Sequence, residues 1–388
     1  EIYMGDWSSD VCSSDLRALV APGSRRRVSL PTYPFARTRY WIPAEIPHWS
    51  GGAERTAAKE IAPLADVAEH FYASRWVRAE SSSKSGSLPA TKHVVRALQG
   101  ADTSLDEAIE RHATQLFERA QAILRAGVRQ TTLLQVLVQL ASVDETAMLA
   151  ATLGALLKSA RRENPKLHFQ VIEAEGGLSE AELREILADA DSRPGGQQIR
   201  YRQRECLVLR NEPARNASIR GQSWRDGGVY LVTGGGGGLG RIFAHEIVRS
   251  VRDARIILSG RRELPADERS WLQGLQRNGA IVDYQQLDVA DEDAVRSCVE
   301  RIVRDHGTLH GVIHAAGVIR DGFVIKKDVS QFREVLQPKV RGTLLLDRHT
   351  ANLPLDFFVL FSSVAGVVGN AGQVDYAAGR SEEHTSEL

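Results

Sequence analysis

Residues 228–252 read GVYLVTGGGGGLGRIFAHEIVRSVR, and this stretch decides the fold. Gly228–Thr233 is an almost continuous apolar run bounded by glycine, which is typical of a buried parallel strand. Five consecutive glycines follow, and then a helical pattern over Arg241–Arg252. In this context a glycine motif predicts dinucleotide binding, because glycine lets the backbone approach a pyrophosphate and the helix N-terminus offers free N–H groups. The alternative, a flexible glycine joint, does not explain the strand before it and the helix after it.

Apolar runs separated by helical patterns continue downstream, which favours a doubly wound α/β fold. The expected strands are Ala254–Ser259, Ile281–Leu287, Gly311–His314 and Leu355–Phe361. The first of them ends in Gly260-Arg261-Arg262. Enzymes that use NAD usually carry Asp or Glu at this place for the ribose 2′-hydroxyl, whereas arginine suits the 2′-phosphate of NADP. Arg261 therefore favours NADPH, with a solvated surface arginine as the alternative.

A second α/β pattern lies upstream, from about Phe71 to Arg210, and it contains no glycine-rich phosphate loop. A nucleotide fold without its nucleotide loop most simply serves as a scaffold. The expected elements are a helix from Leu105 to Leu124 stopped by Gly127, a strand over Thr131–Leu140, a helix capped by Asp144 and running to about Arg162, a strand over Leu167–Glu173, a helix from Ser179 to about Ala190, and a strand over Ile199–Leu209.

The composition excludes several classes of protein. The chain has 388 residues, and 43% of them are hydrophobic, which is enough for two globular domains. Lys+Arg and Asp+Glu balance at 49 each, so we expect neither nucleic acid nor a membrane surface as a partner. Cys12, Cys206 and Cys298 follow no metal or disulfide spacing, and no metal is expected. No apolar run reaches the ~20 residues of a membrane span, which favours a cytoplasmic protein.

The two ends resemble translated sequencing adapter. The DNA AGATCGGAAGAGCACACGTCTGAACTC encodes residues 380–388, RSEEHTSEL, and its reverse complement, shifted by one frame, encodes Ser8–Asp15. Selection on a protein does not explain two ends related by reverse complementarity; ordinary disordered tails are the alternative. We therefore expect residues 1–16 and 380–388 to lie outside the natural protein, and we expect weak or no NADPH binding and no turnover from residues 1–388 alone.

Three residues complete a recognisable constellation. Ser363 follows the strand LDFFVLF, Tyr376 follows the serine, and Lys339 lies upstream in the run QPKVRG. With the loop Thr233-Gly234-x-x-x-Gly238-x-Gly240, this set resembles the short-chain dehydrogenase/reductases. The upstream lysine makes it similar to the ketoreductase domains of modular (type I) polyketide synthases, since most other short-chain reductases place the lysine four residues after the tyrosine. Position 380 is Arg, where the family has Asn.

The resemblance implies roles for these residues. Tyr376 would be the general acid, Lys339, expected on an earlier helix, would tune the acidity of the phenol, and Ser363 would hold the carbonyl oxygen. It also implies a set of residues around the cofactor. This set is Thr233, Gly234, Gly236, Gly237, Gly238, Leu239, Gly240, Ser259, Arg261, Asp288, Val289, Ala315, Ala316 and Gly317.

The domain organisation follows from the same resemblance. We expect two tandem Rossmann-like units: a truncated structural subdomain over residues 66–225 and a doubly wound NADP-binding catalytic subdomain over 226–379, incomplete at its C-terminus. Arg25–Pro43, which contains LPTYPF and RYW, resembles the linker after a ketosynthase or acyltransferase domain, and we assign 17–65 to it. A generic extended linker is the alternative. A polar break is expected at Ser81–Ser87.

The implied reaction is the reduction of a β-ketoacyl thioester on an acyl carrier protein by NADPH. Neighbouring ketosynthase and acyltransferase domains would be partners in the same polypeptide. A D-configured alcohol is favoured by Asp321, although Arg320, Ala371 and Asp375 depart from the D-type pattern. The runs GVIRDGF and DFFVLFSSVAGVVGNAGQVDYAAG resemble assembly lines whose acyltransferase acts in trans. A catalytically silent structural module and a free-standing NADP reductase are the alternatives.

Overall fold

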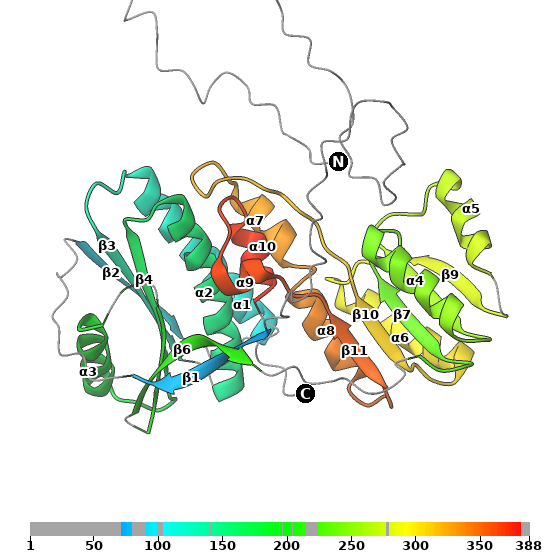
Figure 1. Cartoon of the computed structure of the whole chain (residues 1–388), viewed down its shortest axis with the longest axis horizontal. Helices are drawn as coiled ribbons and strands as arrows, with labels where there is room; N and C mark the ends of the chain where they lie inside the picture. Colours follow the sequence, from blue (N-terminus) through cyan, green and yellow to red (C-terminus); the bar gives the residue numbers. More distant parts are fainter. Residues whose placement is uncertain are drawn as a thin grey trace, which may run out of the picture. The chain divides into compact units, whose positions relative to one another are not determined.

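The computed structural model describes residues 71–79, 91–98, 104–139, 142–193, 195, 197–203, 205–214, 224–276 and 279–381. The predictions for residues 1–65, for the break at 81–87 and for residues 382–388 lie outside this described part. Two β-sheets with their helices belong to one compact unit, Ala68–Leu388 (Figure 1). Among the described helices, none is long and apolar enough to cross a bilayer.

The first sheet has the strand order β1-β6-β5-β4-β3-β2. Strands β2 to β5 are parallel, β6 pairs antiparallel with β5, and β1 pairs antiparallel with β6. Its elements are β1 (Phe71–Arg78), β2 (Thr91–Leu98), α1 (Leu105–Arg125), β3 (Thr132–Gln139), α2 (Val143–Glu163), β4 (Leu167–Ala174), α3 (Glu180–Asp191), β5 (Gln197–Arg202) and β6 (Glu205–Ala214).

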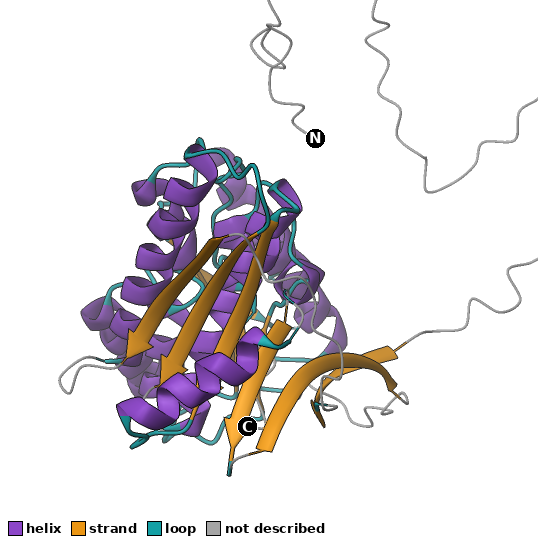
Figure 2. Ribbon diagram, turned by 90° about the vertical axis from the view of Figure 1, so that its left-hand side faces the viewer, coloured by secondary structure: helices purple, strands orange, loops and turns teal. Residues whose placement is uncertain are grey.

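Helices cover both faces of this sheet (Figure 2). Leu134 and Phe169 face α1 and α2 in one core, whereas Leu137 and Ile172 face α3 in another, as the two-residue period of a strand requires. The parallel strands follow one another in chain order, so the sheet lacks the reversal of strand order at which α/β proteins open a ligand crevice. The scaffold role expected for this half stays a prediction.

The second sheet is parallel, with the order β11-β10-β7-β8-β9. The chain starts at the central strand β7, winds outward through β8 and β9, and returns to build β10 and β11 on the other side. This is the expected doubly wound topology, with its switch point between β7 and β10. Its elements are β7 (Val229–Thr233), α4 (Gly238–Ser250), β8 (Arg255–Gly260), α5 (Ala266–Leu275), β9 (Ile281–Gln286), α6 (Glu292–His306), β10 (Gly311–His314), α7 (Val329–Leu336), α8 (Arg341–Thr350), β11 (Phe357–Leu360), α9 (Val364–Val368) and α10 (Val374–Gly379).

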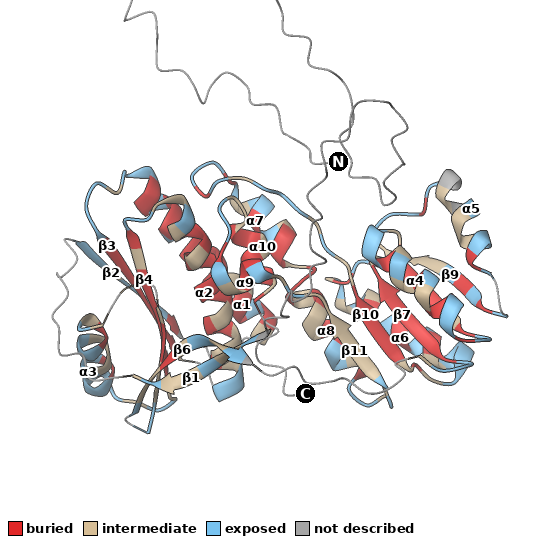
Figure 3. Cartoon of the chain, in the orientation of Figure 1, coloured by how far each residue is buried: buried red, intermediate tan, exposed pale blue. Residues whose placement is uncertain are grey.

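Helices of the C-terminal half complete the core of the N-terminal half. Phe332 of α7 stacks on Phe117 of α1, with ring centroids 4.6 Å apart. Val374 and Ala378 of α10 are fully buried in the same core. Figure 3 colours buried stretches of α2, α7 and α10 red. The N-terminal half therefore packs directly against α7 and α10 of the C-terminal half.

The helix and strand predictions are confirmed in outline, with three corrections. Ser142, not Asp144, caps α2, because its hydroxyl accepts the N–H of Glu145 in a capping box. The strand expected over Ile199–Leu209 is a hairpin of β5 and β6, which turns at Gln203 with φ 50°. No Gly or Pro signals this turn. Helix α4 begins at Gly238, earlier than the expected Arg241.

Candidate active site

The predicted site residues follow the carboxyl ends of the parallel strands of the second sheet. Gly234 follows β7, Arg261 follows β8, Ala315 follows β10, and Ser363 closely follows β11. Since parallel strands end at the same edge, these residues lie along the edge where α/β folds place their ligands, although Ser363 is not among the described residues that line the cavity there. Tyr376 is added to this edge by α10.

Lys339 and Tyr376 come together at this edge. The Lys339 Nζ lies 5.5 Å from the centre of the Tyr376 ring. The lysine is 3% exposed, and its Nζ donates to the backbone oxygens of Val318 and Val335, at 2.8 and 3.0 Å. Burial, aided by the charge of Arg380, lowers the Lys339 pKa to about 7. The expectation that Lys339 lies on a helix is wrong, because it occupies the turn between α7 and α8, beyond the end of the amphipathic helix at Leu336.

Tyr376 sits in the first turn of α10, half-buried against Ala155 of the scaffold half and Ala365 of α9. A second cation is near its ring, since the Arg380 guanidinium carbon lies 5.7 Å from the ring centre. Within the described residues, the Tyr376 hydroxyl has no hydrogen-bond partner. The hydroxyl is therefore available to a ligand.

Ser363 lies at the start of α9. Its hydroxyl accepts the N–H of Ala365 at 3.2 Å, which makes Ser363 the N-cap of this short helix. A hydroxyl that accepts from the backbone can still donate its proton to another oxygen. The cap therefore orients Ser363 while leaving its donor for a ligand.

A cavity of about 470 Å³ opens beside the glycine turn. Eight of the predicted cofactor residues line it: Gly234, Gly236, Gly237, Arg261, Val289, Ala315, Ala316 and Gly317. Thr233, Gly238, Leu239, Gly240, Ser259 and Asp288 are not among the described lining residues. Ser259 is fully buried, and its hydroxyl has no hydrogen-bond partner within the described part of the chain.

The glycine turn fits a pyrophosphate for two reasons. Gly234 has φ 67°, and a Cβ there would lie 2.6 Å from the oxygen of Ala315, so no larger residue fits. Helix α4 begins after Gly237 with no side chain capping its first amides. The amides of Gly238, Leu239 and Gly240 are therefore left to an anion at the helix N-terminus.

Arg261 lines the same cavity at the end of β8 and is exposed. Its guanidinium lies 3.8 Å from the Glu334 carboxylate, a contact too long and too exposed to hold it firmly. The side chain is therefore available to a phosphate group in the cavity. Tyr284, which sequence reasoning missed, lines the cavity too and donates its hydroxyl to the oxygen of Arg262 at 2.9 Å.

A buried hydrogen-bonded chain connects the glycine turn to the turn that carries Lys339. His314 Nδ1 lies 2.7 Å from the hydroxyl of Thr233, and His314 Nε2 lies 2.8 Å from the oxygen of Pro338, next to Lys339. A carbonyl oxygen only accepts, so Nε2 carries the proton and Nδ1 accepts from the threonine. Complete burial lowers the His314 pKa to about 4, which keeps the ring neutral. A histidine inside an apolar strand was the signal that could have found it.

Comparisons with known proteins agree with this geometry. The family described as "KR domain" matches residues 228–385. Polyketide synthase PksL of Bacillus subtilis is 42% identical over 281 residues, 72% of this chain, and PksN of the same organism is 36% identical over 289 residues, 73% of this chain. The crystal structure of a ketoreductase domain from the bacillaene assembly line is 33% identical, with a TM-score of 0.72, and the match covers 81% of this chain and 78% of that chain. The chain belongs to the ketoreductase domains of polyketide synthases.

The ketoreductase spans only 6% of the length of PksL and 5% of PksN. The family match begins at Gly228, immediately before β7, and runs into the segment predicted to be adapter. The match to the bacillaene ketoreductase covers 81% of this chain, and the PksL alignment covers 281 residues. Both are longer than the family match, which covers residues 228–385.

Sequence reasoning also missed a buried ion pair of this ketoreductase. Lys327 Nζ lies 2.6 Å from Asp375 Oδ2, and the two side chains are 0% and 1% exposed. Asp321, the predicted stereocontrol residue, accepts from the Gln373 amide at 3.1 Å through both carboxylate oxygens. No local pattern relates these partners, because each pair joins segments far apart in the chain.

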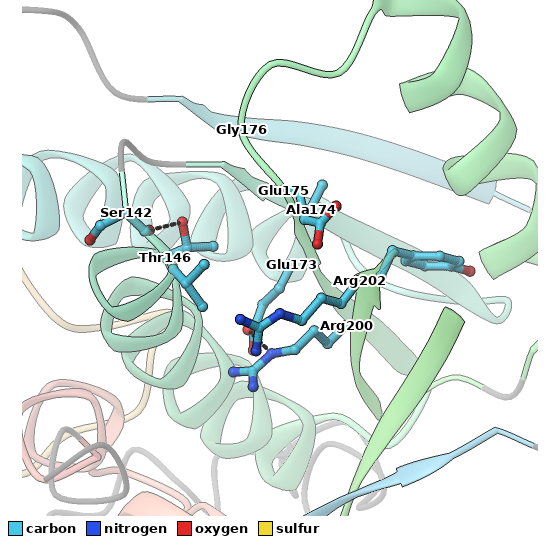
Figure 4. Close-up of a pocket in the computed structure, with 10 residues that line it drawn as sticks. Ser142, Thr146, Glu173, Ala174, Glu175, Gly176, Arg200 and Arg202 are labelled. Carbon is cyan, nitrogen blue, oxygen red and sulfur yellow. Dashed lines mark hydrogen bonds and ion pairs between the residues drawn. The ribbon is translucent and has the colours of Figure 1, made fainter. Parts of the chain in front are cut away.

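A second, smaller pocket of about 60 Å³ lies at the carboxyl ends of β4 and β5 in the scaffold half of the ketoreductase. Figure 4 shows Glu173 and Arg200 pointing toward one another in it, with Nε and Oε2 2.7 Å apart. Burial raises the Glu173 pKa to about 7, against the opposing effect of Arg200. Ser142 at its rim caps α2, because its hydroxyl accepts the N–H of Glu145.

Proposed function

We propose that this protein reduces a β-ketoacyl thioester to a β-hydroxyacyl thioester with NADPH during polyketide biosynthesis. The observation that carries the proposal is the approach of the buried Lys339 amine to the Tyr376 ring beside the glycine-lined cavity. Family membership supports the reaction class. The acyl chain would be carried by an acyl carrier protein, and ketosynthase and acyltransferase domains would be neighbours in the same synthase, as expected for the much longer polyketide synthases it resembles.

The cofactor would be held by the turn Gly234–Gly240 and by the first amides of α4, and when bound it supplies a hydride to the ketone carbon. Negative charge then develops on the ketone oxygen. Tyr376 donates its phenolic proton to that oxygen, and the Ser363 hydroxyl donates a hydrogen bond to it as the charge forms. The nearby Lys339 cation stabilises the phenolate that remains. A positioned acid of this kind contributes about 10²–10⁴-fold to the rate.

NADPH rather than NADH is supported by Arg261. Its guanidinium lines the cavity at the end of β8, where an arginine can bind a ribose 2′-phosphate through paired hydrogen bonds. No acidic residue occupies the two positions that follow Gly260, because residues 261 and 262 are both arginine.

A D-configured product is supported by Asp321. Its carboxylate bonds to Gln373, three residues before Tyr376, so it lies on the loop that faces the catalytic helix. A charged, oriented side chain at this place can restrict how the ketone enters beside the tyrosine.

Turnover tests the proposal. The protein expressed from the complete gene is mixed with NADPH and the pantetheine thioester of 3-oxobutyrate, and NADPH absorbance and product configuration are followed. We expect NADPH consumption with formation of the D-3-hydroxybutyryl thioester, and slow turnover with NADH. The 388-residue chain serves as a comparison, and we expect no turnover from it, as the sequence predicts. A folded gene product that binds NADPH but forms no hydroxy thioester would contradict the proposal.

A further inference from the structure

Two segments that flank the catalytic residues are joined side by side. One is the loop Val318–Asp328 between β10 and α7, and the other is the turn 369–373 that leads into α10. The Gly322 N–H donates to the Gly372 oxygen at 2.8 Å, and the Gln373 amide donates to the Asp321 carboxylate. The loop of the predicted stereocontrol residue is thus attached to the turn before Tyr376.

A buried ion pair reinforces this junction from inside. Lys327, at the end of the loop, pairs with Asp375 at 2.6 Å, and the lysine also donates to the Arg320 oxygen. The other carboxylate oxygen of Asp375 accepts the backbone N–H of Tyr376 at 2.8 Å. One carboxylate therefore connects the loop directly to the backbone of the catalytic tyrosine.

The scaffold half holds the same two segments. The Glu163 carboxylate at the end of α2 accepts the N–H of Val324 at 2.8 Å and the N–H of Gly372 at 3.1 Å. The Gln121 amide on α1 donates to the oxygens of Val324 and Lys327, at 2.6 and 2.7 Å. Every backbone group that these two side chains bind lies in the loop or in the turn, so the scaffold fixes both segments relative to each other.

A contribution to stability does not by itself explain why a charged pair is buried here. Removing two charges from water costs more than a well-packed apolar pair would, and replacing a buried ion pair with apolar residues is often neutral or stabilising. A charged pair does, however, impose one geometry, because a displaced partner leaves an uncompensated charge. It suits a place where the relative position of two segments matters.

We propose that the Lys327–Asp375 pair is a positioning device that fixes Tyr376 relative to the Asp321 loop, and thereby sets both the rate of proton donation and the face of the ketone that is reduced. This inference rests on the proposed ketoreduction. It assigns no contact with substrate to Lys327 or Asp375, which act through the tyrosine and the loop.

The test uses a neutral double variant, Lys327→Met with Asp375→Asn. A single Lys327→Met leaves an unpaired buried carboxylate and could unfold the protein, whereas the added Asp375→Asn change removes that charge and keeps an oxygen for the Tyr376 N–H. The matched control is Arg200→Met with Glu173→Gln, which removes a buried ion pair of the scaffold half (Figure 4). Both variants lose one ion pair, and only the first loses a link between the two segments.

The first measurement is amide hydrogen exchange on the 388-residue chain. We expect exchange at the amides of Gly322 and Gly372 to rise about tenfold or more in the Lys327→Met/Asp375→Asn variant, because local opening becomes easier. The control variant should leave both amides within about twofold of the unmutated chain.

The second measurement is turnover in the protein expressed from the complete gene. We expect kcat to fall about ten- to a hundredfold, since small misplacements of a catalytic group have effects of this size. The dissociation constant of NADPH should change less than about twofold, because neither residue lines the cofactor cavity. The minor product configuration should increase, an effect that a general loss of stability would not produce.

Unchanged exchange at Gly322 and Gly372 would overturn the inference. So would raised exchange accompanied by an unchanged kcat and product configuration. If the unmutated gene product forms no hydroxy thioester, the proposed function fails, while exchange in the shorter chain still decides whether the ion pair holds the two segments together.

Discussion

The amine of Lys339 lies 5.5 Å from the centre of the Tyr376 ring, although the two residues come from different parts of the chain. Lys339 is held by two backbone oxygens in a buried turn, and burial lowers its pKa to about 7. The relationship places a buried amine beside the phenol that is the acid in the proposed reaction. It is the arrangement on which the proposed reaction depends.

Replacing Tyr376 by Phe should lower kcat by about 10²–10⁴-fold, because the phenolic proton is lost while the ring remains. The dissociation constant of NADPH should stay within about twofold, since Tyr376 does not line the cofactor cavity. Steady-state turnover and fluorescence titration of NADPH, both on the protein expressed from the complete gene, measure the two effects. Tyr201→Phe is the control, because Tyr201 bonds to Asp189 in the scaffold half. Activity retained by Tyr376→Phe would remove this residue from the role of acid.

Replacing Arg380 by Asn should raise the pKa of Lys339 above its value of about 7, because a neighbouring positive charge disfavours the ammonium form. Between pH 7 and the ordinary lysine value of 10.5, the unfolded chain binds a proton that folded Lys339 does not, so this residue makes stability increase with pH in that window. A higher pKa of Lys339 in the folded state narrows the pH range over which stability increases. NMR titration of the reductively methylated lysine measures the shift, with Arg296→Asn, an exposed residue paired with Asp293, as the control.

Most of the fold could be predicted because strands and helices have strong local signals. The apolar run before the glycines is β7, and the capping and stop residues Ser179 and Gly127 bound α3 and α1 as expected. The hairpin after β5 was missed because Gln203 adopts a positive φ without a glycine or a proline to indicate it. Local patterns predict helices and strands. They do not predict a turn, such as the one between β5 and β6, that carries no glycine or proline and depends on the pairing of the two strands.

The same distinction applies to the candidate site, where some residues could be predicted from the sequence and others could not. Lys339, Ser363 and Tyr376 could be predicted as candidates because their order along the chain is characteristic of the family. Their predicted catalytic roles stay predictions, as does the binding of cofactor by the glycine turn. The partners of His314 and the Lys327–Asp375 pair depend on contacts between distant segments, which a single sequence does not reveal.

Replacing Arg261 by Ala should weaken NADPH binding about 10- to 100-fold, because charge-assisted hydrogen bonds to a phosphate are worth about 1.5–3 kcal/mol. NADH binding should change less than about twofold, since that cofactor has no 2′-phosphate. Fluorescence titration of the protein expressed from the complete gene with both cofactors measures the difference. Arg262→Ala, the neighbouring arginine on the same loop, shows whether the effect belongs to position 261 or to the net charge of the loop. Equal losses for NADH and NADPH would contradict a 2′-phosphate contact.

Replacing Thr233 by Val should lower the free energy of unfolding by about 1–3 kcal/mol, because the buried Nδ1 of His314 and the Ala316 N–H both lose their partner. Urea denaturation at pH 7 measures this change. Thr350→Val is the matched control: Thr350 is equally buried, but its hydroxyl donates to the Leu346 oxygen inside a helix, so little is left unsatisfied and the loss should be under about 1 kcal/mol.

The pH dependence gives Thr233→Val a second, independent readout. Folded His314 has a pKa of about 4 and the unfolded value is 6.5, so the unfolded chain takes up a proton first and stability falls as the pH drops from 6.5 toward 4. Loss of the threonine donor removes a hydrogen bond that favours the neutral ring, and this should raise the folded pKa and flatten the fall. Plots of the free energy of unfolding against pH for Thr233→Val and Thr350→Val should therefore differ in slope between pH 6.5 and 4. Parallel curves would mean that the Thr233 hydroxyl does not donate to His314, and that the glycine turn is not joined to the lysine turn through this ring.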